Sequence, residues 1–181
     1  MPASGNESTK LIIIRGNSAS GKTTAAWEIR RRFHHRSLAI VSQDVLRREI
    51  LRVKGEGNNP APGLIDLTAR YALDHGFHVV VEGILGSPSH GEMLTQLVHD
   101  HAGETTCFYY DIPFDETVAR HASKPQSAEY GAEMMREWYR DRDLIPALNE
   151  HIFGPEVSQD AAVRKMMEAV DMPIYDAKDE S

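Results

Sequence analysis

Short apolar runs alternate with amphipathic segments along the whole chain. The apolar runs that read as strands are 10–15, 38–41, 78–83 and 105–110, with a weaker candidate at 149–153. The segments in which apolar residues recur at helical spacing are 21–33, 45–53, 64–75, 90–101, 115–122, 132–143 and 158–170. Continuous apolar runs are typical of strands buried on both faces of a parallel sheet. The alternation therefore predicts an α/β fold with right-handed crossovers between parallel strands.

The length of the chain and the positions of its breaks predict one domain. A chain of 181 residues can form one compact domain with a sizeable core, so we expect a single domain over residues 1–181. The polar segments 1–8 and 172–181 are expected to fray. Turn-rich stretches interrupt the pattern at 54–63 and 123–131, and long loops within a domain are often functional.

Composition narrows the classes of protein and partner. Hydrophobic residues make up 41% of the chain, which indicates a globular fold rather than disorder. The formal net charge of −7 disfavours general binding to nucleic acid or to an anionic membrane, so we expect neither as a partner. Cys107 is the single cysteine, which excludes an intrachain disulfide and a cysteine zinc site. No apolar run reaches the length of a membrane span and no secretory signal is apparent, so we expect a cytoplasmic protein.

Residues 16–23 read Gly-Asn-Ser-Ala-Ser-Gly-Lys-Thr, which fits the pattern G-x-x-x-x-G-K-T. They lie between a predicted strand and a predicted helix, the context that a phosphate-binding loop requires. Glycines let backbone N–H groups turn toward phosphate oxygens, and the N-terminus of the next helix adds partial positive charge. Lys22 can reach the β- and γ-phosphates of a nucleotide, and the Thr23 hydroxyl can bind Mg²⁺. We therefore expect a nucleoside triphosphate site formed by Gly16, Asn17, Ser18, Ala19, Ser20, Gly21, Lys22, Thr23 and Thr24.

Two carboxylates stand at the ends of predicted strands. Asp44 follows the strand at 38–41, and Glu82 ends the strand at 78–83. Ligands of open α/β sheets gather at the carboxyl ends of the strands, so both side chains are expected near the phosphate-binding loop. Asp44 either caps the next helix, with Arg47 and Arg48 as its partners, or accepts the proton of a substrate hydroxyl, and the two roles are compatible. Arg47 or Arg48 could hold the substrate or steady the aspartate.

Glu82 has three interpretations. It is either an ordinary polar strand end, an outer-sphere ligand that holds a Mg²⁺-bound water, or a substrate contact.

Arginines recur in the segment from about residue 120 to 142. Arg136 and Arg140 lie four residues apart on one face of the predicted helix, where like charges repel. Either acidic neighbours on that helix offset them, or an anion such as the transferring phosphate lies between them. Arg120, on the nucleotide side, and Lys124 flank the break at 123–131 and are candidates for the same clamp. Such a segment would exclude water and stabilise transition-state charge.

These motifs together resemble those of the small P-loop kinases, in particular the group with zeta-toxin-like kinases, chloramphenicol phosphotransferase and polynucleotide 5′-hydroxyl kinase. The resemblance rests on GNSASGKT at 16–23, VSQD at 41–44, VVVEG at 79–83 and a lid-like segment at about 120–142. It implies a P-loop NTPase three-layer sandwich: a five-stranded parallel sheet of order 2-3-1-4-5, helices on both faces and a small helical lid. It also implies Asp44 as the catalytic base, with lid arginines drawn from Arg120, Arg136, Arg140 and Arg142.

The sequence thus predicts an ATP-dependent kinase that transfers the γ-phosphoryl group to a hydroxyl of a small molecule, with ATP and Mg²⁺. The acceptor stays open among antibiotics, sugars, nucleosides and similar compounds, because the resembling proteins act on varied substrates. The alternative is a nucleotide-binding regulatory or partner-binding module without phosphoryl transfer. A GTPase switch is disfavoured because no Asn-Lys-x-Asp motif is present.

Overall fold

A five-stranded parallel sheet forms the centre of the computed structural model, which describes residues 3–53, 59–123, 125–128 and 130–175. Its strand order is β2-β3-β1-β4-β5, as the resemblance implied. The strands are β1 (Lys10–Gly16), β2 (Leu38–Ser42), β3 (His78–Gly83), β4 (Glu104–Tyr110) and β5 (His151–Phe153). Residues 54–58 of the expected long loop, and Lys124 and Glu129 of the expected break, lie outside the described residues.

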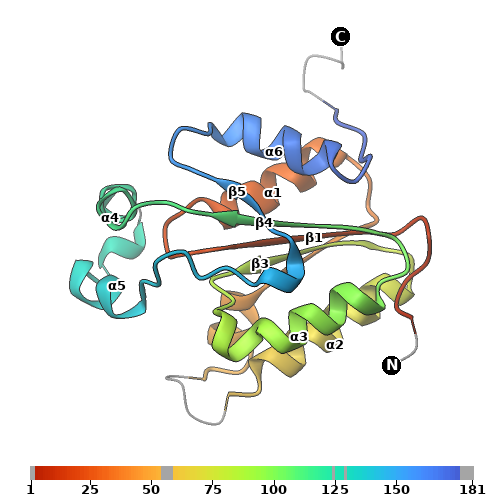
Figure 1. The fold of residues 1–181 in the computed structure, drawn as a ribbon, viewed down its shortest axis with the longest axis horizontal. Coiled ribbons are helices and arrows are strands. Elements are labelled where there is room, and N and C mark those ends of the chain that lie inside the picture. Colours follow the sequence, from red (N-terminus) through yellow and green to blue (C-terminus); the bar gives the residue numbers. More distant parts are fainter. Residues whose placement is uncertain (1–2, 54–58, 124, 129, 176–181) are drawn as a thin grey trace.

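Helices cover both faces of the sheet. The α-helices are α1 (Lys22–Phe33), α2 (Ala61–Asp74), α3 (Ser87–Asp100), α4 (Phe114–Ala122), α5 (Ala132–Trp138) and α6 (Gln159–Glu168). Shorter elements are the π-helical η1 (Val45–Ile50) and the 3₁₀ turns η2 (Pro125–Ala128) and η3 (Pro146–Leu148). Figure 1 shows α1 and α6 on one face, α2 and α3 on the other, and α4 and α5 beyond the end of the sheet.

The alternating side chains of β1 explain why the chain reads as continuous apolar runs. Ile12 and Ile14 belong to the core beneath α1 and α6, whereas Leu11 and Ile13 belong to the core beneath α2 and α3. All four side chains are fully buried. A central parallel strand covered on both faces has no solvent-facing side, so hydrophobic burial favours apolar residues at every position.

The prediction of a helix over 132–143 is wrong at its C-terminal end, because the helix stops earlier in the structure. The α5 helix stops at Trp138, and Tyr139 already has extended backbone angles, with φ −67° and ψ 127°. The last helical bond runs from Tyr139 N to Met135 O, after which the backbone of Arg140 bonds to a side chain from another part of the chain. Arg136 and Arg140 therefore do not share a helix face.

The N-terminal segment is held more firmly than we expected. Ser4 is buried, its N–H donates to Asp100 O at 2.8 Å, and its carbonyl accepts from Ala102 N at 3.0 Å. Gly5 N donates to Asp74 Oδ1 at 2.8 Å, so residues 4 and 5 dock against the ends of α2 and α3. The structure thus differs from the fraying expected over 1–8. Residues 1–2 and 176–181 lie outside the described part of the chain.

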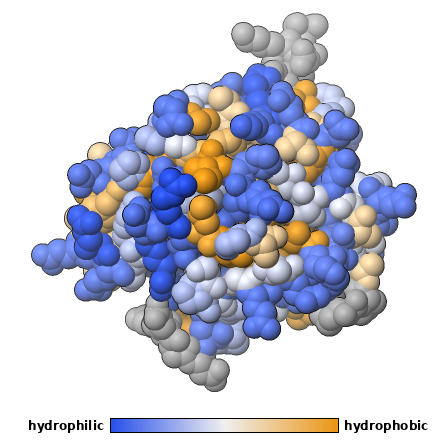
Figure 2. All heavy atoms as spheres, viewed as in Figure 1, coloured by the Kyte–Doolittle hydropathy of each residue, from blue (hydrophilic) through white to orange (hydrophobic). Residues whose placement is uncertain are grey.

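Polar side chains cover most of the face shown in Figure 2, with smaller apolar patches between them. Among the residues that the structure describes, no helix combines the length and the apolar character needed to cross a membrane.

Candidate active site at the carboxyl end of the sheet

The phosphate-binding loop leaves β1 at the carboxyl end of the sheet. Gly16 has a φ of +145°, and a Cβ built on it would lie 2.8 Å from Tyr110 O, so only glycine fits this turn. The loop closes around the buried side chain of Lys22, whose Nζ donates to Asn17 O at 2.6 Å and to Ser20 Oγ at 3.2 Å. At the start of α1, Gly21 has a φ of +108°. The expected strand, loop and helix therefore follow one another in the structure.

Thr23 meets Glu82 beside this loop. The Thr23 hydroxyl donates to Glu82 Oε2 at 3.0 Å, and the Ser42 hydroxyl donates to Glu82 Oε1 at 2.5 Å. The strand register explains the meeting, because Glu82 on β3 lies between Ser42 on β2 and Ile14 on β1. Glu82 is only 2% exposed. Sequence reasoning missed Ser42, which looked like an ordinary strand end.

Asp44 lies one strand away from Glu82, on the exposed surface just after β2. It precedes η1 with helical backbone angles, and its carboxylate makes no capping hydrogen bond within the described residues. The preceding residue, Gln43, is buried and accepts a bond from Leu85 N at 2.9 Å. A Cβ on Gly83 would lie 2.5 Å from Gln43 Cβ, so the exit of β2 packs tightly on the exit of β3. This packing fixes the point from which Asp44 projects.

The η1 element carries Arg47 and Arg48 beyond Asp44. Arg47 is half-buried and Arg48 is exposed. Leu51 N donates to Leu46 O, the wider bonding pattern of a π-helix, which is found disproportionately at functional sites. On the first turn of α3, burial lowers the pKa of His90 to about 4, and the charges of Arg15 and Arg47 add to that shift. His90 is therefore neutral at pH 7.

Two side chains of the segment 120–130 touch the phosphate-binding loop. Arg120 Nη1 donates to Ser20 O at 3.2 Å, while its Nε donates to Glu116 Oε1 at 2.9 Å. The hydroxyl groups of Tyr130 and Ser18 lie 3.3 Å apart. Arg120 is thus in contact with the loop, and its expected role at the nucleotide stays a prediction.

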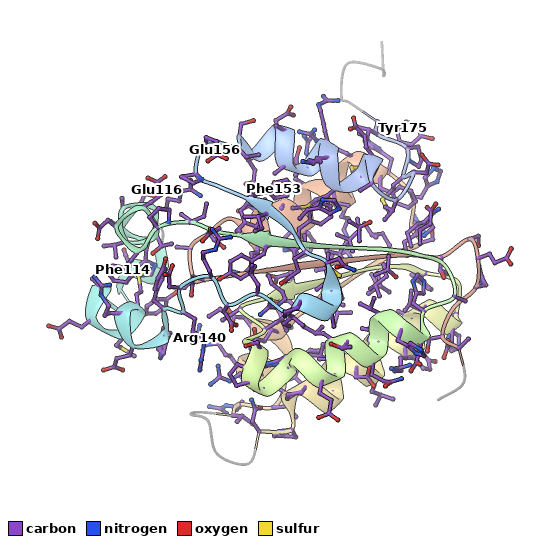
Figure 3. All side chains as sticks on the ribbon, in the orientation of Figure 1. Phe114, Glu116, Arg140, Phe153, Glu156 and Tyr175 are labelled. Carbon is purple, nitrogen blue, oxygen red and sulfur yellow. The ribbon has the colours of Figure 1, made fainter. Side chains whose placement is uncertain are left out.

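Arg140 is joined to the loop through its backbone. The Asn17 side chain donates from Nδ2 to Arg140 O at 2.7 Å, and its Oδ1 accepts from Arg140 N at 2.9 Å. A Cβ on Gly86 would lie 3.7 Å from Arg140 Nε. The guanidinium group therefore lies close to the connection between β3 and α3, and Figure 3 shows Arg140 in the chain that follows α5.

The remaining arginines of this segment contact other groups. Arg136 lies over the ring of Phe114, with its Cζ 3.6 Å from the ring centroid, and Figure 3 shows Phe114 beside α4 and α5. Arg142 Nη1 lies 3.4 Å from Asp111 Oδ2, with more than half of the arginine side chain exposed. Within the described residues, no hydrogen bond or ion pair joins either guanidinium group to the phosphate-binding loop. Their expected roles at the phosphates stay predictions.

Sequence reasoning also missed a buried ion network directly before the loop. Arg15 is fully buried, and its Nε donates to Leu85 O at 3.0 Å. Its Nη1 donates to Glu150 Oε1 at 2.7 Å and its Nη2 to Asp143 Oδ2 at 3.0 Å. Asp143 also accepts from the Ser87 N–H at 2.8 Å and the Ser87 hydroxyl at 2.5 Å, which caps α3. The available signal was an arginine that ends a buried strand, because a buried charge requires partners.

The structure brings most of the predicted residues to one edge of the sheet. The loop, Thr23, Asp44, Glu82 and Arg140 gather at the carboxyl ends of β1, β2 and β3. The described residues contain no cluster of three or more histidine, cysteine, aspartate or glutamate side chains that could hold a metal alone. A site with few protein ligands suits Mg²⁺, which keeps several waters and also binds substrate phosphates.

The sequence matches the AAA domain family over residues 11–140, which is more than half of the chain. The chain belongs to this family. The matched stretch runs from β1 through the phosphate-binding loop to Arg140, so it includes that loop, Asp44, Glu82 and Arg120. Among curated proteins, no relative matches the sequence.

Solved structures share the complete fold of this AAA domain at low sequence identity. APS kinase from Mycobacterium tuberculosis, in complex with AMPPNP and APS, is 16% identical and covers 94% of this chain and 99% of its own, with a TM-score of 0.71. A sugar kinase from Janibacter is 14% identical over 91% of this chain and 95% of its own, with a TM-score of 0.64. The tunicamycin resistance protein of Deinococcus radiodurans is 13% identical over 93% and 99%, with a TM-score of 0.61. These similarities show the P-loop kinase fold.

Proposed function

We propose that this protein is an ATP-dependent kinase that transfers the γ-phosphoryl group to a hydroxyl group of a small molecule. The main supporting observation is that Thr23 of the phosphate-binding loop donates a hydrogen bond to Glu82, while Asp44 projects from the end of the neighbouring strand. A similar fold has been solved with AMPPNP and APS in an APS kinase, which supports a nucleotide donor and a small acceptor. The net charge of −7 favours such an acceptor over a nucleic acid.

The residues present fit a nucleoside triphosphate with Mg²⁺. The loop has the positive φ angles and the buried lysine that a phosphate cradle needs. Thr23 and Glu82 supply hard oxygen donors next to it, the type of ligand that Mg²⁺ prefers, with Glu82 acting directly or through a bound water. Mg²⁺ bound there would offset negative charge on the β- and γ-phosphates.

The donor half of the reaction belongs to the loop and its neighbours. Backbone N–H groups of residues 16–24 and the N-terminus of α1 bind the phosphates, and Lys22 offsets charge on the β- and γ-phosphates. Arg120 lies at the rim of the loop, on Ser20 O, where it can contact the nucleotide.

The acceptor-binding half of the proposed site lies around Asp44. The acceptor hydroxyl oxygen forms a bond to the γ-phosphorus while the bond from that phosphorus to the ADP oxygen breaks. Asp44 takes the hydroxyl proton as general base. Arg47 and Arg48, on the η1 element that follows Asp44, bind the acceptor or orient Asp44. Lys22 and the arginines that reach the phosphoryl group, Arg136 or Arg140, stabilise its charge during transfer.

The experiment that tests this function compares the wild type with the Asp44→Asn variant. Both proteins are titrated with MgATP and then assayed for ADP formation with panels of sugars, nucleosides and hydroxyl-bearing antibiotics. We expect equal ATP affinity and a loss of transfer of about 100-fold or more, the usual contribution of a general base. The exposed Asp74→Asn variant is the matched control.

Two results would contradict the proposal. Wild-type transfer by Asp44→Asn would remove Asp44 as the base. Tight MgATP binding by the wild type, with no transfer to any compound and no hydrolysis, would instead favour a nucleotide-binding module.

A further inference from the structure

Arg140 lies between the nucleotide-binding half and the acceptor-binding half of the proposed site. Its backbone is bonded to the phosphate-binding loop, whereas its guanidinium group lies beside Gly86, which connects β3 to α3. β3 itself carries Glu82, the partner of Thr23. The side chain thus starts at the donor side and extends toward the acceptor side.

The side-chain carboxamide of Asn17 attaches the backbone of Arg140 to the phosphate-binding loop. Asn17 is 5% exposed, and its side chain forms both a donated and an accepted bond with residue 140. A carboxamide is suited to this, because it offers a donor and an acceptor side by side, as one residue of a β-strand does. Removing it would leave two backbone polar groups of Arg140 without these partners, which is costly where water has limited access.

A second anchor keeps the same stretch in place three residues later. The Asp143 carboxylate is bonded to Arg15 and to both donors of Ser87, and Asp143 N donates to Tyr109 Oη at 3.1 Å. We call residues 139–145 the strap. Because α5 ends at Trp138, the strap is fixed by these contacts and not by helical bonds. The position of the Arg140 guanidinium group therefore depends on the Asn17 side chain more than on the helices α4 and α5.

We propose that Asn17 is a positioning residue: it holds the strap so that Arg140 contacts the phosphoryl group as that group passes from ATP to the acceptor. This rests on the proposed kinase function. Asn17 occupies a variable position of the loop motif, so the motif alone assigns it only a nucleotide contact through its backbone. The inference adds a role for its side chain, and it selects Arg140 among the arginines of the lid segment.

The kinetic test is a double-mutant cycle of Asn17→Ala, Arg140→Gln and the double variant, measured as kcat and KM for MgATP. ATP hydrolysis without acceptor is the readout, followed by transfer once an acceptor is found. We expect Asn17→Ala to lower kcat about tenfold or more while KM for MgATP changes less than about threefold. The double variant should be no slower than Arg140→Gln alone, because both changes remove one interaction. Additive losses, or a raised KM with unchanged kcat, would overturn the proposal.

Two controls separate positioning from the general effect of a substitution. Gln96→Ala removes a carboxamide from α3, where it donates to Asp100, and Arg164→Gln removes a charge from an exposed ion pair on α6. Both lie outside the proposed site and should keep kcat within about twofold of the wild type, as surface changes usually do. If Asn17→Ala unfolds, Asn17→Ser retains a smaller polar group and takes its place in the cycle.

A hydrogen-exchange measurement tests the strap independently of turnover. In the nucleotide-free wild type, the Arg140 amide should be protected because it donates to Asn17 Oδ1. Its exchange should be at least tenfold faster in Asn17→Ala and unchanged in Gln96→Ala. Equal protection in all three proteins would sink the inference even if the protein is a kinase. Absence of any ATP turnover in the wild type would count against the proposed function alone, and the exchange rates would still decide whether Asn17 holds the strap.

Discussion

At the scale of single residues, the site is built from side chains whose neighbours lie on other strands. Glu82 is the clearest case, because its two oxygens accept from hydroxyls at the ends of β2 and α1. A sequence pattern shows a carboxylate at a strand end, but only the register of β2, β3 and β1 shows which groups face it. The strand-end position made Glu82 a candidate but left its role open among three interpretations, and Ser42 could not be selected at all.

Glu82→Gln should weaken the binding of Mg²⁺ without unfolding the protein. The amide keeps the volume of the side chain but loses the negative charge that attracts the ion, directly or through a bound water. We expect the Mg²⁺ concentration for half-maximal ATP turnover to rise about tenfold, as the loss of one charged hydrogen bond implies. Ser42→Ala, which removes a partner of Glu82 without changing the charge, is the control. Equal Mg²⁺ titrations for all three proteins would remove Glu82 from the metal site.

At the scale of elements, the alternating pattern predicted most strands and helices because burial alone determines them. β1 is such a case, because every residue from Leu11 to Gly16 is buried. The end of α5 could not be predicted, since residues 139–143 have a composition compatible with a helix. There a distant side chain, Asn17, competes with the helical bonding pattern for the backbone of Arg140. Tertiary contacts of this kind override local propensity.

The ion network around Arg15 should control the stability of the strap and of the first turn of α3. Arg15→Met removes the cation and leaves Asp143 and Glu150 buried with less compensation, each with less than a sixth of its side chain exposed. We expect a loss of about 3–5 kcal/mol in the free energy of unfolding, measured by urea denaturation. The comparison is Arg142→Met, at the exposed ion pair of the same strap, which should cost less than about 0.5 kcal/mol. Similar losses in both variants would contradict a special role for the buried network.

At the scale of the whole molecule, two buried histidines lie at opposite ends of α3, where that helix meets other parts of the fold. His90 lies at the start of that helix, and His101 follows its end, where it bonds to the hydroxyls of Thr9 and Thr105. Both imidazoles are buried. Neither was assigned a role from the sequence, because a histidine's burial depends on how the helices cover the sheet.

These two histidines predict a loss of stability in mild acid. Burial lowers the pKa of His90 and of His101 to about 4, against an ordinary value of 6.5. Between those values the unfolded chain binds more protons than the folded chain, so the free energy of unfolding is complete above about pH 6.5 and decreases as the pH falls toward 4. We expect each histidine to account for roughly 1–3 kcal/mol of that decrease.

Urea denaturation at several pH values checks this with His101→Gln. The variant should lose less stability than the wild type between pH 7 and pH 4.5. His75→Gln, at the exposed end of α2, should follow the wild-type curve. Parallel curves for all three proteins would exclude a contribution from His101.

The attachment of Asn17 and Arg15 to the strap also orders events during synthesis of the protein. Arg140, Asp143 and Glu150 leave the ribosome more than a hundred residues after Asn17 and Arg15, the residues that they contact. Contacts between such distant parts of a chain form late, since a large loop must close first. A nascent chain that already contains the whole nucleotide-binding motif therefore lacks the support of that motif until the strap has emerged. Competence to bind nucleotide is thus expected to be acquired only after residues 139–145 have emerged.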